Sequence, residues 1–129
     1  MAFSSFREEE RWRNLSALVR VGWWEADFST RRYLLSEFIY KLLGISCNII
    51  SFDDFCQNVA EDYKDRINML ATICPNGMED VNFPLHTVEG VVWVKLLVGE
   101  REIQSDGNLL LRGTLQCINE PDKAELVSV

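Results

Sequence analysis

The sequence predicts an α+β domain built on one antiparallel sheet. Two stretches near the N-terminus and three in the last third alternate apolar and polar side chains, which is typical of half-buried strands. Between the two groups lie three short stretches with helical spacing and capping residues. The 129 residues suit a single domain. The expected order is therefore a helix, two strands, three short helices and a meander of three strands.

Residues 4–20 are predicted to form an amphipathic helix. Its apolar side chains recur at steps of three or four residues: Phe6, Trp12, Leu15, Leu18 and Val19. Two hypotheses remain open: the stripe packs on its own domain, or on the same helix of a second chain. The outward row expected on the last strand is polar and suits the stripe poorly: Arg112, Thr114 and Gln116. This favours a homodimer formed through Phe6, Trp12, Leu15 and Val19.

The first strand places Trp24, Ala26 and Phe28 on one apolar face, while acidic residues occupy the other. A turn at residues 29–31 follows, and residues 33–35 return as a short second strand. We expect the two strands to pair, with their apolar side chains turned toward the same core.

Three helices are expected next. Ser36 is placed to cap the first, over residues 37–43, and Gly44 ends it. Ser51 is the expected cap of the second helix. The third, over residues 63–73, has an apolar face made of Ile67, Met69, Leu70 and Ile73.

The last third reads as three strands. The first of them alternates from residue 81 to residue 86, and Pro84 indicates that it lies at an edge or a bulge. Residues 91–104 and 109–118 are predicted to pair as a hairpin, because Asp106-Gly107-Asn108 tolerates the positive φ that tight turns require. Residues 120–129 are polar and contain a proline, so we expect a linker there.

Composition excludes several classes of partner. The net charge is −7, whereas nucleic acids and anionic membranes reward clustered lysine and arginine. No apolar run approaches the roughly 20 residues of a membrane span, and the first residues carry no signal-peptide core. We therefore expect a soluble, cytoplasmic protein without nucleic-acid or membrane contacts.

Cysteines and acidic residues are side chains of this chain that could bind a metal ion. The four cysteines are far apart in sequence and are predicted to be reduced, small apolar residues of the core: Cys47, Cys56, Cys74 and Cys117. An alternative to a binding module is a small enzyme or metal-binding domain that uses the acidic residues Asp53, Asp54, Glu61 and Asp62. The first turns of helices attract the same residues, so we expect no metal.

Five short motifs, in order, resemble those of PAS domains. A G-x-W-x-W-D pattern is matched by Gly22, Trp24 and Asp27, with Ala26 in place of the second tryptophan. The other matches are Leu42-Leu43-Gly44, then Phe55, Val59, Glu61-Asp62 and Asp65-Arg66, then Glu89-Gly90 with Trp93-Val94, and finally residues 113–119. The resemblance spans roughly residues 21–119 and implies a five-stranded antiparallel sheet with short helices on one face.

The resemblance also implies an organisation and a role. Residues 1–20 would be a flanking helix, residues 21–119 the PAS-like domain, and residues 120–129 a linker toward an output domain. Such a module is sensory or dimerising and has no activity of its own, and it is commonly part of a sensor histidine kinase. In the family, an Asp-Ile-Thr ending joins the last strand to an output helix. Cys117 and Asn119 replace its polar residues, so this chain departs from the family at the residues that would transmit a signal to that helix.

The resemblance does not extend to a bound cofactor. The residues around Cys47 lack the Asn-Cys-Arg-Phe motif of flavin-binding members, and residues 63–73 contain no histidine to hold haem. The single histidine, His86, is expected on the polar face of a strand. A small apolar ligand would lie between sheet and helices, against Trp24, Phe38, Leu42, Phe55, Ile67, Leu70, Phe83, Leu96 and Leu115.

Overall fold

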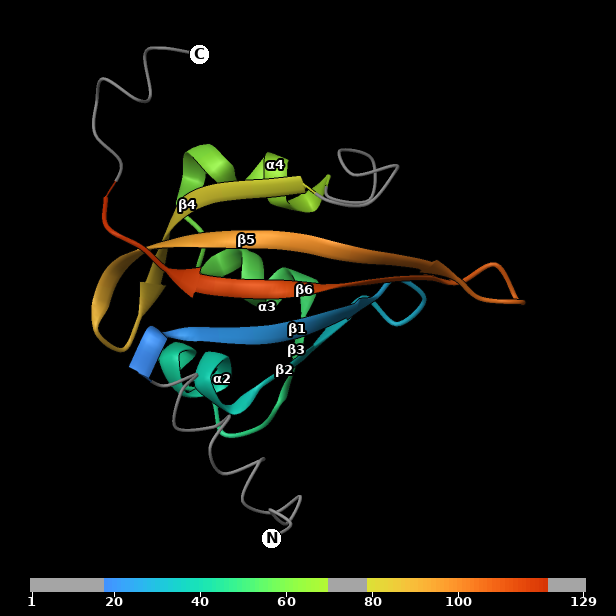
Figure 1. Cartoon of the computed structure of the whole chain (residues 1–129), viewed down its shortest axis with the longest axis horizontal. Coiled ribbons are helices and arrows are strands. Elements are labelled where there is room, and N and C mark those ends of the chain that lie inside the picture. Colours follow the sequence, from blue (N-terminus) through green and yellow to red (C-terminus); the bar gives the residue numbers. More distant parts are fainter. Residues whose placement is uncertain (1–17, 70–78, 121–129) are drawn as a thin grey trace, which may run out of the picture.

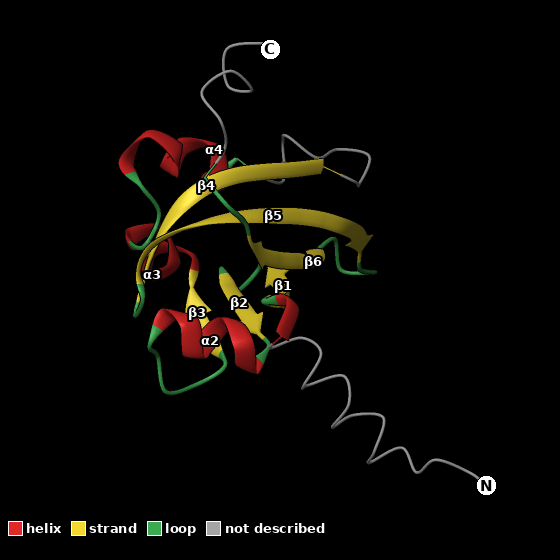
Figure 2. Ribbon diagram, turned by 60° about the vertical axis from the view of Figure 1, so that its left-hand side comes forward, coloured by secondary structure: helices red, strands yellow, loops and turns green. Residues whose placement is uncertain are grey.

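The computed structural model describes residues 18–69 and 79–120 and contains one sheet of six antiparallel strands in the order β3-β2-β1-β6-β5-β4 (Figure 1). The strands are β1 Val21–Asp27, β2 Arg32–Leu35, β3 Ile49–Ser51, β4 Glu79–Thr87, β5 Gly90–Ile103 and β6 Leu109–Cys117. The helices are α2 Glu37–Leu43, α3 Phe52–Gln57, the 3-10 turn η1 Glu61–Tyr63 and α4 Lys64–Asn68. The sheet curls, and the helices lie on one side of it (Figure 2).

The predicted α+β class is confirmed, but the sheet has six strands where five were expected. The added strand is β3, whose Ile50 pairs with Tyr33 of β2. Three residues are too few to show an alternation, and Ser51 at its end reads equally well as the start of a helix. The structure shows that Ser51 serves both elements, because its Oγ also accepts a hydrogen bond from the Asp54 amide at 3.0 Å.

Two close approaches at glycines fix the centre of the sheet. Trp24 on β1 pairs with Gly113 on β6, and its indole Nε1 donates to the Thr114 carbonyl at 3.0 Å. A Cβ at Gly113 would lie 2.8 Å from the Trp24 ring. Gly22, within β1, allows a second close approach, since a Cβ there would meet Ile39 of α2 at 2.6 Å. The large aromatic side chain and α2 therefore pack against bare backbone.

The helix boundaries agree with the sequence in part. Gly44 ends α2 with a φ of 76°, as predicted. Ser36 is not a side-chain cap: its Oγ accepts from the Trp23 amide at 3.0 Å, so it ties α2 to β1. The third helix is a 3-10 turn followed by α4, and Met69, expected on the apolar face, is 52% exposed. The part of this prediction at residues 70–73 lies outside the described residues.

The meander is confirmed. β5 and β6 form the predicted hairpin, and Gly107 in its turn has a φ of 87°. β4 is an edge strand of the described sheet, as Pro84 indicated. Part of that edge is covered, because Ala60 donates to the Pro84 carbonyl at 3.2 Å and His86 donates to the Asn58 carbonyl at 2.7 Å. The segment at residues 58–60 thereby acts as a short extension of the sheet.

One apolar core lies between the sheet and the helices, and no charged side chain of the described ranges is buried in it. The prediction that the cysteines are core residues is wrong for Cys47, which is exposed, while Cys56 and Cys117 are half-buried. All three are free thiols, and Cys74 falls outside the described residues. Within the described part of the chain, no helix is long and apolar enough to cross a membrane.

Candidate functional site

The structure gathers most of the predicted ligand-contact residues into the core. Seven of them are at most 4% exposed and belong to one cluster: Trp24, Leu42, Phe55, Ile67, Phe83, Leu96 and Leu115. Phe38 is half-buried against the same cluster, and Leu70 lies outside the described residues. These side chains come from the sheet and from α2, α3 and α4, so they lie between the sheet and the helices, where the ligand is expected. That they contact a ligand stays a prediction.

The core also contains an aromatic group around Tyr33, which the sequence pattern does not indicate. The Tyr33 ring lies 6.1 Å from the Trp24 ring, 4.6 Å from that of Phe52 and 5.2 Å from that of Phe55, measured between centroids. Burial raises the pKa of the Tyr33 hydroxyl. Burial thus disfavours the phenolate, and the Tyr33 ring contributes packing to the core.

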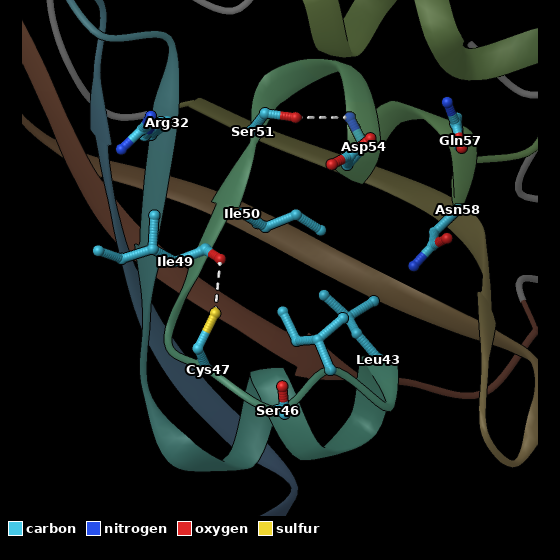
Figure 3. Close-up of a pocket in the computed structure, with 11 residues that line it drawn as sticks. Arg32, Leu43, Ser46, Cys47, Ile49, Ile50, Ser51, Asp54, Gln57 and Asn58 are labelled. Carbon is cyan, nitrogen blue, oxygen red and sulfur yellow. Dashed lines mark hydrogen bonds between the residues drawn. The ribbon is translucent and has the colours of Figure 1, made fainter.

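A second feature is an open pocket of about 490 Å³ at the edge of the sheet, beside β3 (Figure 3). Its lining comes from β2, α2, β3 and α3 and the segments beside them: Arg32, Leu43, Ile45, Ser46, Cys47, Ile49, Ile50, Ser51, Asp54, Gln57 and Asn58. None of the predicted ligand-contact residues is among them. The Cys47 thiol donates to the Ile49 carbonyl at 3.3 Å. The thiol is thus engaged in a local turn contact.

The acidic residues of the alternative hypothesis are dispersed. Among residues 18–69 and 79–120, no three His, Cys, Asp or Glu side chains come together in a group that could hold a metal ion. Asp53 lies 3.8 Å from Arg31, and Glu61 pairs with Lys64 at 3.0 Å. His86 is exposed on β4, as expected. Both Asp53 and Glu61 are therefore engaged in local ion pairs at the surface.

Asp27 joins the two turns at one end of the sheet. Its Oδ1 accepts from the Ser29 amide at 3.0 Å, from the Ser29 hydroxyl at 2.8 Å and from the Asn108 side-chain amide at 3.0 Å. These hydrogen bonds, with those of Ser29 first, hold the pKa of the Asp27 carboxyl below its usual value. The last residue of the G-x-W-x-W-D pattern thus fastens the β1–β2 turn to the β5–β6 hairpin.

The outer face of the sheet carries a charged cluster. Arg112 on β6 reaches Glu25 on β1 at 2.6 Å, and Glu100 and Glu102 on β5 at 3.2 Å and 3.1 Å. The hydrogen bond to Glu25 contributes most to raising the pKa of Arg112, and Glu102 and Glu100 add to it. Within the polar outward row predicted for the last strand, Arg112 thus links three strands of the sheet.

Comparison with known proteins identifies the fold. No family model and no curated protein matches the chain. The solved structure of a sensory box histidine kinase/response regulator from Burkholderia thailandensis superposes with a TM-score of 0.65, at 17% identity, over 92% of each chain. This chain has the PAS fold.

Two further structures agree. The N-terminal domain of a diguanylate cyclase with a PAS/PAC sensor from Marinobacter aquaeolei gives a TM-score of 0.61 at 16% identity, over 76% of this chain and 94% of that one. A histidine kinase domain from Haloarcula marismortui, described as light and redox sensing, gives a TM-score of 0.60 at 15% identity, over 85% of this chain and 99% of that one. The motifs that resembled PAS domains thus correspond to contacts that build this fold, as Gly22, Trp24, Asp27 and Gly113 show.

Proposed function

We propose that this chain is a non-catalytic sensory module of a larger, cytoplasmic signal-transduction protein, with a two-component sensor histidine kinase as the parent. The observation that carries the proposal is the PAS fold, shared over most of both chains with the structure of a sensory box histidine kinase. The charged side chains of Asp27 and Arg112 support a non-catalytic role, since both are engaged in joining strands and turns.

The test uses the full-length parent protein and two alanine substitutions in the same sheet. Gly113→Ala forces β5 and β6 apart, whereas Gly99→Ala meets its nearest atom at an ordinary 3.9 Å. We expect Gly113→Ala to uncouple the output activity from its signal while the output domain keeps its basal turnover, and Gly99→Ala to leave regulation intact. Output that remains normally regulated in a parent whose PAS domain is unfolded would overturn the proposal.

The ligand that we propose is small and apolar and binds between the sheet and the helices. Support comes from the predicted ligand-contact residues within the described chain. All of them are hydrophobic, and they include Trp24, Phe55 and Phe83. No cofactor is part of the proposal. Native mass spectrometry of the purified chain should show an added small mass that Phe83→Trp, which enlarges a side chain with no exposed area, removes. An unliganded mass under gentle conditions, together with absence of a stabilising compound in a thermal-shift screen, would contradict it.

We also propose a homodimer through the N-terminal helix, by way of Phe6, Trp12, Leu15 and Val19. The last helical residues before β1 support it, because Leu18 is 78% and Val19 51% exposed. That end of the apolar stripe is not buried in its own domain; Phe6, Trp12 and Leu15 lie outside the described residues.

The dimer is tested by light scattering and thermal melting. Trp12→Glu with Leu15→Glu should give a folded monomer, since two carboxylates cannot be buried in an apolar interface without a large desolvation cost. Arg11→Glu changes the charge by the same amount from the polar side of the helix and should remain dimeric. A monomeric wild type at tens of micromolar, or an unfolded double variant, would refute the dimer.

A further inference from the structure

Arg20 stands where the helical residues Leu18 and Val19 give way to β1, and it makes an unusual set of contacts. Its φ is 57°, in the left-handed region that residues other than glycine seldom adopt. Its guanidinium Nη2 lies 2.8 Å from Glu89 Oε1 and 3.6 Å from the Cys117 sulfur. The guanidinium carbon also lies 5.8 Å from the centre of the Phe38 ring. One side chain thus reaches three separate elements.

The backbone of Arg20 adds a fourth contact. Its carbonyl accepts a hydrogen bond from the Cys117 amide at 2.9 Å, at the residue where β6 ends. The segment that leads into the domain and the segment that leaves it are therefore bonded side by side. They lie at the same end of the sheet, since Val21 pairs with Gln116.

Two of the elements that Arg20 reaches are fastened to each other. Glu89 belongs to the β4–β5 turn, and the next residue toward β4, Val88, donates from its amide to the Leu42 carbonyl at 3.0 Å. Leu42 is in α2, the helix that also carries Phe38. A Cβ on Gly44, which ends α2, would lie 2.5 Å from Val88. The turn and the helix are therefore joined to each other beside Arg20.

We propose that Arg20 couples α2 and the β4–β5 turn to both segments that flank the domain. A displacement of α2 or of the turn is passed through the guanidinium to the end of β6 and, through the backbone of Arg20, to the helical residues before β1. The left-handed conformation supports this, because such a residue persists only where its surroundings hold it in place. The coupling is a property of the domain itself, so it stands whether or not the chain is a sensor.

Arg31 provides a matched control within the same chain. It has nearly the same backbone conformation, with a φ of 54°, and its guanidinium lies 5.3 Å from the Phe52 ring and 3.8 Å from Asp53. Its carbonyl accepts from the Phe52 amide at 2.9 Å. These partners all belong to α3, and none of them flanks the domain. Arg31 therefore has the same kinds of interaction without the proposed connection.

The experiment compares Arg20→Asn with Arg31→Asn by residue-resolved hydrogen exchange on the 129-residue chain. Asparagine tolerates the left-handed region, so each change removes the guanidinium with little backbone strain. We expect Arg20→Asn to speed exchange about two- to fivefold at the amides of both Val88 and Cys117, the scale expected for loss of one partly exposed ion pair. Arg31→Asn should leave both amides unchanged and affect Phe52 instead.

Faster exchange at Val88 alone or at Cys117 alone would overturn the proposal, because it would show that the two sites are not coupled. The same pattern in both variants would also overturn it, because it would show general destabilisation. Should Arg20→Asn fail to fold, Glu89→Gln removes the charge of the partner and should give the same pattern at smaller amplitude. A negative result leaves the sensory role untouched, since that role is tested in the parent protein by Gly113→Ala.

Discussion

Gly113→Ala should disrupt the centre of the sheet. A Cβ at Gly113 would lie 1.7 Å from the Leu97 carbonyl oxygen on β5, whereas ordinary contact begins at 3.4 Å. The obstacle is backbone of a paired strand, so no rotamer change relieves it. The new Cβ would also lie 2.8 Å from the Trp24 ring, which is 3% exposed and packs directly over the glycine.

The expected cost follows from these contacts. Overpacking in a core typically costs about 1 to 3 kcal/mol. Separating β5 from β6 here also strains ladder hydrogen bonds and the bond from the Trp24 indole to Thr114, each worth about 1 kcal/mol. We expect a loss of roughly 3 kcal/mol or more, a large part of the 5 to 15 kcal/mol that holds a typical domain.

The assay is urea denaturation followed by tryptophan fluorescence. Gly99→Ala is the control, because its new Cβ would have the Arg112 carbonyl oxygen at 3.9 Å as nearest contact. We expect Gly99→Ala to stay within about 1 kcal/mol of the wild type. A Gly113→Ala variant within that same margin, or a Gly99→Ala variant as unstable as Gly113→Ala, would refute the reasoning.

Two further predictions concern the turns. Gly107→Val should cost about 1 to 3 kcal/mol because its φ is 87°, whereas Gly107→Asn should cost much less; an unchanged denaturation midpoint for the valine variant would contradict this. Asp27→Asn should flatten the acid dependence of stability. The pKa of Asp27 is lowered in the folded state, so its contribution is full above the ordinary value of 3.8 and is lost as the pH falls below it. Urea midpoints at pH 3 and pH 7 test this, and parallel wild-type and variant profiles would count against it.

The sequence predicts local features of this fold well. The alternation around Trp24 and Ala26 places both residues in the core, and Gly44 and Gly107 take the positive φ expected of them. Ser51 caps α3 as predicted. In each case the physical cause lies within a few residues of the position, so a sequence pattern is sufficient to reveal it.

What the sequence did not reveal depends on distant partners. Ser36 bonds to the amide of Trp23, 13 residues earlier, and not to its own helix. Arg20 meets Glu89 and Cys117, which are 69 and 97 residues away. The pocket beside β3 is also not apparent from the sequence, because residue type alone predicts a buried Cys47, whereas this residue is exposed. Periodicity shows which side chains face inward, but it does not show whether the space between them is filled.

The covered edge of β4 bears on how copies of this domain meet. A free edge strand offers unpaired backbone groups to any other strand and is a common starting point for aggregation. Here Pro84 has no amide to offer, its carbonyl is taken by Ala60, and the His86 amide is taken by Asn58. The opposite edge, β3, is only three residues long. Strand-to-strand joining into fibrils or extended sheets is thereby discouraged along these stretches, which leaves helices and sheet faces as the surfaces for ordered association.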